Sequence, residues 1–364
     1  MNPIRRTLVT AALAATLGAA LPAAAQQTFN LTIASSHPTT LPWVGLMSTL
    51  FVPEVNKRVE ALGKGYKINW REAYGGQLYK MNATLSSVEQ GVTDIGWVFG
   101  NLEGAKMPLL QVSANAPFAS DNLPVILEVM NELNETVPAL KAEWDKNNMV
   151  FLGASGVDTY HLWTKFPVNT VADLKGKKIS APGVLGTWLR GTGATPVDGS
   201  LTSYYTDIQT GVSEGTVSIA TGILPAKVYE VAPYITKANM GALYNGGMAI
   251  NKDTWNKLPP EIQRIMKDVG KEYSKKLGEE VMARYNNALK TMVEVGAKQN
   301  PPVTLAELPP ADRANWIKTM PNIAGDWVKT NEAKKLPAKQ VMEAYMDGLR
   351  KRGEKPARDW DKEI

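Results

Sequence analysis

The chain has 364 residues, no cysteine and two histidines, and its 40 lysines and arginines nearly balance 35 acidic residues. Without cysteine, disulfides, thiolate catalysis, iron–sulfur clusters and cysteine-ligated zinc are excluded, and two distant histidines leave no His-rich metal site. The mild positive excess includes no basic arm, so it gives no sign of nucleic-acid binding. The length is sufficient for two domains.

Residues 1–25 predict a secretory signal peptide. Arg5 and Arg6 form a basic start, residues 8–21 are an apolar run, and residues 23–25 are a small-residue cleavage signature. The run is shorter than the roughly 20 residues that span a bilayer, although a retained N-terminal anchor is the alternative. Removing this segment leaves 40 − 2 = 38 basic against 35 acidic residues, a net charge of +3. We therefore expect an exported, periplasmic mature chain.

Strands and helices alternate in the first part of the mature chain. Residues 29–34, 66–73 and 94–99 are rich in β-forming residues and predict strands. Apolar residues at helical spacing predict a helix over residues 45–62, with an irregularity at Pro53. This alternation is typical of an α/β domain with a mostly parallel sheet.

A second α/β unit follows the first. Its predicted strands cover residues 149–153, 161–165, 177–182, 194–197, 217–221 and 243–251. The third of these strands leads through a loop into a helical segment, and a strand end beside a helix start is a good place to hold a ligand. Ser180, a small neutral hydroxyl in this strand, is the position expected to face such a ligand.

The clearest periodic signal is a stripe of apolar residues at three- and four-residue steps from Ile262 to Met292. Because the stripe keeps its phase through Gly270 and Gly278, one helix is favoured over two helices broken at these glycines. At about 1.5 Å per residue it would be roughly 50 Å long. Such a helix exceeds one small domain and is predicted to brace two, while residues 311–364 add further helices.

Catalytic motifs are scarce. The chain has no G-x-S-x-G elbow, no H-E-x-x-H pair and no phosphate-binding G-x-x-x-x-G-K-[ST] loop. Residues 191–193 begin a dinucleotide fingerprint, but the third glycine and the strand–helix context are missing. A catalytic triad could be named from Ser35, His37 and Asp94, but these residue types are so common that their presence alone is no evidence for one. The sequence therefore predicts no catalytic site, no cofactor and no metal.

Aromatic residues gather near the predicted strand ends, where ligands bind in open α/β sheets. They are Trp43, Tyr74, Trp97, Tyr160, Trp163, Trp188, Tyr204 and Tyr205. Core packing is the alternative for each one, but the whole set favours a ligand site. Arg71 and Arg190 are candidates for a bidentate anion contact, and a surface ion pair is the alternative for either.

Five segments then resemble a known family, in order along the chain: residues 75–98, 168–183, 193–215, 229–236 and 248–263. The most specific stretches are DLKGKKI and AINKDTWNKLPPE. Together they resemble the periplasmic solute-binding proteins of TRAP transporters, of the dicarboxylate-binding DctP type.

The resemblance implies a two-domain periplasmic binding protein fold, type II-like, with a hinge and a long helix across both domains. The implied division is residues 26–153 with 243–285, and 154–242 with 286–364. Members of the family bind a small organic acid between the domains and deliver it to membrane permease subunits, which an ion gradient drives. The protein would act as a monomer or homodimer and perform no chemistry.

The chain departs from the family pattern at the carboxylate contact. An arginine that usually follows K-I is Ser180 here, a second arginine position is Tyr160, and a common asparagine position is Ser218. Losing a buried Arg–carboxylate pair costs about 3 kcal/mol, so the hypothesis is a partly apolar or aromatic organic acid, with Arg71 or Arg190 supplying the charge. The predicted ligand-binding residues are Arg71, Tyr74, Trp97, Tyr160, Trp163, Ser180, Trp188, Arg190 and Ser218.

Two other functions stay open at this point. An exported enzyme on the same scaffold would use Ser180 or His161. A binding protein of the same fold could also serve a sensor kinase instead of a permease.

Overall fold

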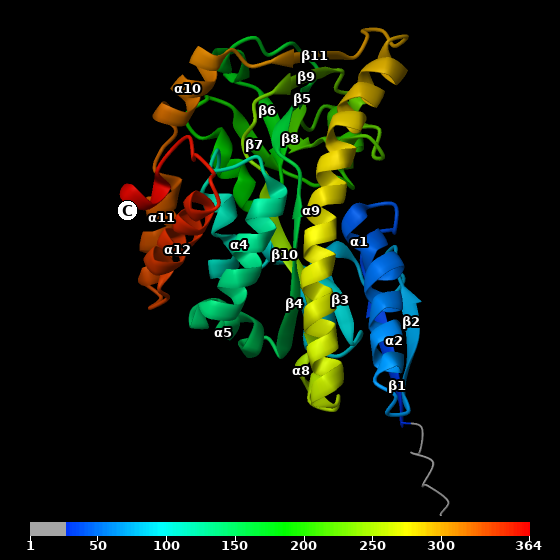
Figure 1. The fold of residues 1–364 in the computed structure, drawn as a ribbon. Coiled ribbons are helices and arrows are strands. Elements are labelled where there is room, and N and C mark those ends of the chain that lie inside the picture. Colours follow the sequence, from blue (N-terminus) through cyan, green and yellow to red (C-terminus); the bar gives the residue numbers. More distant parts are fainter. Residues whose placement is uncertain (1–26) are drawn as a thin grey trace, which may run out of the picture.

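The computed structural model describes residues 27–364 and contains two sheets stacked end to end (Figure 1). The predicted signal peptide lies outside the described residues. The first sheet has the order β2 (Tyr66–Ala73), β1 (Gln27–Ala34), β3 (Ile95–Phe99), β10 (Leu243–Asn251) and β4 (Met149–Val157). The second has the order β11 (Thr304–Glu307), β9 (Tyr234–Lys237), β5 (Tyr160–Thr164), β8 (Gly215–Ile219), β6 (Lys178–Ala181) and β7 (Thr195–Asp198).

Both sheets are mostly parallel, as the sequence pattern predicted, and each contains one antiparallel strand. In the first sheet β1 is parallel to β2 and β3, and in the second β6 is parallel to β7 and β8. By contrast, β10 is antiparallel to β3 and β4, and β5 is antiparallel to β8 and β9. The antiparallel strands β5 and β10 adjoin the two segments that cross between the sheets, residues 158–159 and 238–242.

Helices cover the first sheet. They are α1 (Pro42–Leu46), a π-helical segment (Met47–Phe51), α2 (Val52–Ala61), α3 (Thr84–Glu89), α4 (Leu123–Thr136) and α5 (Pro138–Lys146). The irregularity predicted at Pro53 is this π-helical segment, which ends just before α2. Pro53 lies in a continuous helical run, directly after the π-helical segment, so its missing N–H falls where the hydrogen-bond pattern changes. The second unit contributes the shorter helices α6 (Tyr204–Thr210) and α7 (Ala220–Ile223), and α8 (Lys252–Trp255) follows β10.

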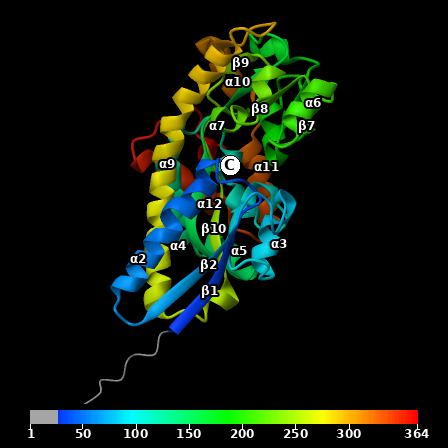
Figure 2. The ribbon, with the colours of Figure 1, turned by 90° about the vertical axis from the view of Figure 1, so that its right-hand side faces the viewer.

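The long helix is a single element, as the apolar stripe predicted. α9 (Pro260–Gly296) has 37 residues and runs beside both sheets (Figures 1 and 2). Its first half contacts β4 and α4 of the first unit. Its second half brings Tyr285, Leu289 and Met292 into a core cluster with Trp163 and Ile235 of the second sheet. The helix therefore joins the two units along its length.

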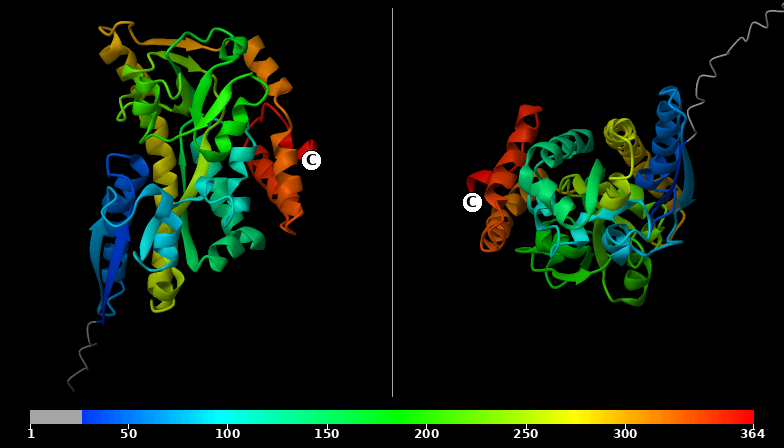
Figure 3. Two further views of the ribbon diagram at one scale, coloured as in Figure 1. Left: turned by 180° about the vertical axis from the view of Figure 1, so that it is seen from behind. Right: turned by 90° about the horizontal axis from the view of Figure 1, so that it is seen from below.

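The last two helices of the chain return to the first unit. α10 (Pro310–Thr319) stays near the second sheet, whereas α11 (Ile323–Glu332) and α12 (Ala338–Lys351) pack in the layer of α4 (Figure 3). Arg352, at the end of α12, forms ion pairs of 2.8 and 2.6 Å with Glu128 and Glu132 of α4. The structure thus differs from the expected division in two respects. The tail is shared between the units, and β4 continues past residue 153.

No helix within residues 27–364 combines the length and the apolar character needed to cross a membrane.

The backbones of α9 and β4 touch. A Cβ atom added at Gly270 would lie 2.1 Å from the carbonyl oxygen of Leu152, and one added at Gly153 would lie 2.2 Å from the carbonyl oxygen of Gly270. No side chain fits in this contact, so both glycines are required by packing.

Gly270→Ala should therefore lower the free energy of unfolding by about 2 kcal/mol. Alanine favours a helix over glycine by up to about 1 kcal/mol, but overpacking against a strand backbone costs about 1–3 kcal/mol and separates the two elements. Urea denaturation measures the change. Lys276→Ala, on the exposed face of α9, is the control and should change stability by less than about 0.5 kcal/mol. Equal stability of Gly270→Ala and the parent chain would contradict the packing argument.

Candidate ligand-binding site

A narrow, enclosed cavity lies where the two sheets meet, at the carboxyl ends of several strands. His37 follows β1, Phe99 ends β3, Pro182 follows β6 and Ile219 ends β8. This is the edge at which α/β sheets bind ligands. The cavity has an empty volume of about 470 Å³, but the centre of a water molecule can occupy only about 40 Å³. That is room for a few waters, so the two units lie close together around the site.

The wall on the side of the first sheet is aromatic. Trp97 and Phe99 share one face of β3 because alternate residues of a strand point the same way, and their rings stack with centroids 5.3 Å apart. Trp43 lies 5.8 Å from Trp97, and His37 meets Trp97 edge-on at 5.3 Å. Contacts of this kind contribute about 0.5–1.5 kcal/mol each. The result is a rigid apolar surface.

The opposite wall comes from the second unit. Tyr160 begins β5, Tyr204 begins α6, and Ser218 lies near the end of β8. The ring of Tyr160 packs edge-on against Trp188, with centroids 5.4 Å apart. Burial raises the pKa of the Tyr160 and Tyr204 phenols above their usual value, so both hydroxyls stay protonated and can donate hydrogen bonds.

Two residues that line the cavity have buried polar atoms without a partner in the described chain. They are the indole Nε1 of Trp43 and the side-chain oxygen Oδ1 of Asn245. Asn245 is 3% exposed and lies at a bulge in β10, where Tyr244 pairs with Gly156 but Gly246 pairs with Ser155. A bulge redirects the side chain of the extra residue. Since a buried polar group without a partner costs about 1–3 kcal/mol, a ligand in the cavity that hydrogen-bonds to these two atoms would gain affinity.

No charged side chain is among the residues that line the cavity in the described structure. Burial lowers the pKa of His37 to about 4, so its imidazole is neutral near pH 7. Its Nδ1 lies 2.9 Å from the hydroxyl of Ser36. A shallower groove adjoins the cavity and opens to solvent; Lys80 and Asp198 lie there, one charge of each sign.

Three of the nine predicted residues line the cavity: Trp97, Tyr160 and Ser218. Ser218 lies opposite His161 in the pairing of β5 with β8, and Trp97 lies opposite Met248 in β10. Trp97 also donates from Nε1 to the hydroxyl of Ser155 at 3.1 Å.

Three others are buried but lie behind the cavity walls. Trp163 stands three positions after Tyr160, so alternation along β5 turns it to the other face, into the core beside α9. Ser180 donates to the hydroxyl of Ser213 at 2.8 Å and does not line the cavity. Trp188 donates from Nε1 to the carbonyl of Ala114 at 2.7 Å and supports the ring of Tyr160.

The remaining three lie away from the cavity. Arg71 is exposed on β2, the outermost strand of the first sheet. Arg190 is exposed and pairs with Asp326 at 2.8 Å, which is the alternative the sequence left open. Tyr74 packs against the first-sheet core, and its buried hydroxyl has no partner in the described chain. None of these three residues lines the cavity.

Other residues of the site were not in the predicted set. His37, Phe99 and Asn245 line the cavity beside those named above. Phe99 follows Trp97 by two positions, and strand alternation could have identified it. The signal for Asn245 is the pair Gly246-Gly247 inside a predicted strand, since glycine there is typical of a bulge.

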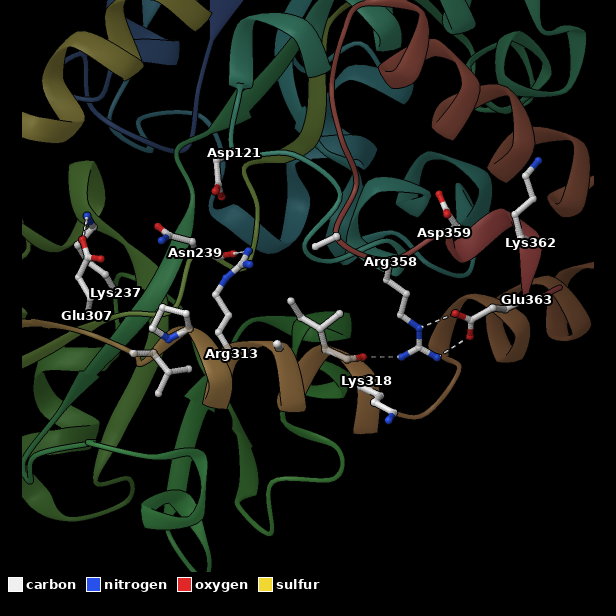
Figure 4. A pocket seen from close by; sticks show the side chains of 15 residues that line it. Asp121, Lys237, Asn239, Glu307, Arg313, Lys318, Arg358, Asp359, Lys362 and Glu363 are labelled. Atoms are coloured by element: carbon white, nitrogen blue, oxygen red, sulfur yellow. Dashed lines mark hydrogen bonds and ion pairs between the residues drawn. The ribbon is translucent and has the colours of Figure 1, made fainter.

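A second, more open hollow lies beside α10 and the C-terminal segment (Figure 4). Many of its lining side chains are charged, but the prominent cations already have partners. Arg313 donates to the carbonyls of Ala238 and Asn239 at 2.9 and 2.7 Å, and Arg358 pairs with Glu363 at 2.6 Å. This hollow is therefore a polar network that holds the crossing segment 238–242 and the C-terminus. Within residues 27–364 no cluster of three or more acidic or histidine side chains is arranged to hold a metal ion.

Comparison with known families agrees with this arrangement. The model of bacterial extracellular solute-binding protein family 7, DctP, matches residues 51–330. The chain belongs to this family. A solute-binding protein of Sulfitobacter sp. (strain NAS-14.1) is 30% identical over 155 residues, which are 42% of this chain and 46% of that protein. The match therefore spans about half the length of that relative.

Solved structures of TRAP solute-binding proteins have the same fold. One, from a marine metagenome and specific for aromatic acid ligands, was crystallised with 3-hydroxybenzoate. It has a TM-score of 0.76 at 21% identity, over 90% of this chain and 99% of that one. Another, from Sulfitobacter sp. NAS-14.1 with β-D-galacturonate, has a TM-score of 0.70 at 20% identity, over 88% and 100%. The predicted α/β fold and the TRAP solute-binding, DctP-type family are confirmed.

Neither histidine of the folded protein should titrate between pH 5.5 and 8. Burial lowers the pKa of His37 to about 4 and that of His161 to about 3, whereas both would titrate near 6.5 in the unfolded chain. Below about pH 6.5 only the unfolded state takes up these protons. Each histidine then reduces the unfolding free energy by about 1.4 kcal/mol per pH unit until its own folded pKa is reached.

Two-dimensional NMR of the imidazole resonances measures both pKa values, and His37→Gln assigns them. Glu143 and Asp158 act in the opposite direction, because burial raises their pKa values to about 7 and about 6. The histidine titration is therefore the direct measurement. An imidazole that titrates near 6.5 would contradict the buried position.

Proposed function

We propose that this chain is the extracytoplasmic receptor of a TRAP-type uptake system. It captures a small aromatic or partly apolar solute between its two units and delivers it to the membrane permease. The observation that carries the proposal is the enclosed cavity with walls from both sheets, formed by Trp43, Trp97 and Phe99 on one side and Tyr160 and Tyr204 on the other. Family membership supports the receptor role, and the signal peptide predicted over residues 1–25 supports a periplasmic location.

A receptor of this kind must open to admit its ligand, and the chain has the connections for this. Two short segments between strands, the long helix α9 and the connection between α10 and α11 join the units. Tyr160 and Gly241 lie where the crossing segments meet: the N–H of Tyr160 donates to the carbonyl of Gly241 at 3.2 Å, and the N–H of Met240 donates to the carbonyl of Tyr160 at 3.1 Å. A few residues at strand ends can absorb a hinge rotation. Tyr160, which lines the cavity, would then move with the hinge.

The cavity favours an aromatic over a dicarboxylic or sugar-type ligand. Five aromatic side chains and the imidazole of His37 line it, and none of its lining side chains is charged. Binding a dicarboxylate there would bury two anions without a cation, which is costly. The aromatic-acid receptor among the solved relatives supports this ligand class by analogy. The site favours binding over catalysis: the hydroxyl of Ser36 lies 2.9 Å from Nδ1 of His37, but burial lowers the pKa of this imidazole to about 4, and within residues 27–364 no carboxylate hydrogen-bonds to it as a third orienting group.

Aromatic solutes should raise the melting temperature of the purified protein. A ligand at 100 times its dissociation constant adds about 2.7 kcal/mol, which is a shift of a few degrees for a protein of this size. Trp97→Leu should abolish the shift. Trp144→Leu is the matched control, because Trp144 is equally buried but packs against Phe151 away from the cavity.

Both variants should lose stability, since each removes a buried ring, but only Trp97→Leu should lose the ligand response. Mass spectrometry of the solute released from freshly purified protein identifies the natural ligand. A small aliphatic dicarboxylate in that position would overturn the proposed ligand class and leave the receptor role intact.

Arg71→Gln and Arg190→Gln, alone or combined, should change ligand affinity less than twofold. Arg71 is exposed on an outer strand, and Arg190 is paired with Asp326 at the surface, where an ion pair contributes about 0–1 kcal/mol. Calorimetric titration with the aromatic solute that gives the largest thermal shift measures the affinity. A loss of tenfold or more would mean that one arginine reaches the ligand.

A further inference from the structure

We infer that the cavity selects an uncharged ring compound, whose polar end both donates and accepts hydrogen bonds, over the matching carboxylate. A primary carboxamide on an aromatic ring has this chemistry. The inference rests on the proposed function and narrows it, because an aromatic receptor could take either form of the polar end.

The first argument is the electrostatic character of the walls. No cation lines the cavity in the described structure, and the nearest basic residue of the adjoining groove, Lys80, is exposed and donates to the carbonyl of Gly76 at 3.1 Å. Asp158 is fully buried between Val157 and Tyr160, two residues that line the cavity. Its carboxylate accepts from the backbone N–H and the hydroxyl of Thr221. A ligand carboxylate would therefore enter a cavity whose lining has no countercharge, and Asp158 places a buried acid behind that lining.

The second argument is the pair of unpartnered polar atoms. Trp43 offers an N–H donor, and Asn245 offers an oxygen acceptor; both residues line the cavity, and both atoms are buried. An ionised carboxylate can only accept hydrogen bonds, so it leaves the oxygen of Asn245 without a donor. A carboxamide can satisfy both atoms with one planar group. The neutral imidazole of His37 and the protonated phenols of Tyr160 and Tyr204 add no charge.

The experiment compares matched acid and amide pairs. Benzoate with benzamide and 3-hydroxybenzoate with 3-hydroxybenzamide are titrated calorimetrically into the full mature protein at pH 7.5, after bound solute has been removed. We expect each amide to bind about tenfold or more tightly than its acid, because only the acid buries an unpaired charge. Acids that bind as tightly as amides would overturn the inference and leave the aromatic receptor standing. If neither series binds, the proposed ligand class fails as well.

Variants test the two atoms separately. Trp43→Phe removes the N–H and keeps most of the ring, so benzamide affinity should fall about fivefold or more. Trp316→Phe is the matched control: its Nε1 is also buried without a partner, but Trp316 does not line the cavity, so affinity should stay the same. Equal effects of the two substitutions would contradict the assigned contact.

Two further variants change the charge of the cavity wall and test whether the preference between benzoate and benzamide changes with it. Ser218→Arg introduces a cation into the cavity wall and should reverse the order, so that benzoate binds more tightly than benzamide. Asn245→Asp replaces the amide by an isosteric acid and should weaken benzoate more than benzamide, since it adds a second negative charge. If Ser218→Arg fails to fold, Asn245→Asp gives the charge comparison with a side chain of the same size. Unchanged preference in Asn245→Asp would overturn the inference.

Discussion

The contact between the backbones of α9 and β4 fixes the geometry on which the site depends. Gly270 and Gly153 let a helix lie directly on a strand of the first sheet. Because α9 continues for 37 residues, it also reaches the core of the second sheet through Tyr285 and Leu289. The two sheets are thereby held on one continuous helix and meet at the carboxyl ends of β1, β3, β4, β6 and β8. The cavity forms at that junction, so its position follows from the packing of the helix.

The same junction explains why the cavity is closed, aromatic and uncharged. Side chains at strand ends from both units must pack against each other when the units meet, and β3 supplies Trp97 and Phe99 to that surface. The bulge in β10 adds one amide, Asn245, to walls that are otherwise mainly apolar. Rings without charge can pack in the closed state at little desolvation cost. A cation at the same position would require an anionic partner before the units could close.

Local patterns predicted the elements well and the site less well. The stripe from Ile262 to Met292 depends only on 3.6-residue periodicity, so α9 was predictable from sequence. Antiparallel insertion of β10 between β3 and β4 depends on contacts about 100–150 residues apart along the chain, and no local pattern encodes it. The same limit applies to side chains. Trp163 does lie near the end of β5. It stands an odd number of positions after Tyr160, however, so its side chain points to the opposite face of the sheet and into the core. The ion-pair partner of Arg190, Asp326, is 136 residues away.

Of the three positions at which this chain departs from the pattern of its family, two line the cavity and one does not. Tyr160 and Ser218 line the cavity, so replacing an arginine and an asparagine there alters what a ligand meets. Ser180 instead donates to Ser213 and lies outside the cavity lining. An arginine at position 160 would carry a flexible charge, whereas Tyr160 presents a ring held by Trp188. In the proposed site the ring of Tyr160 therefore provides a rigid apolar surface where the family resemblance implies a charge, and Trp188 supports that surface from behind. We propose that recognition in this cavity depends on shape and on neutral hydrogen bonds.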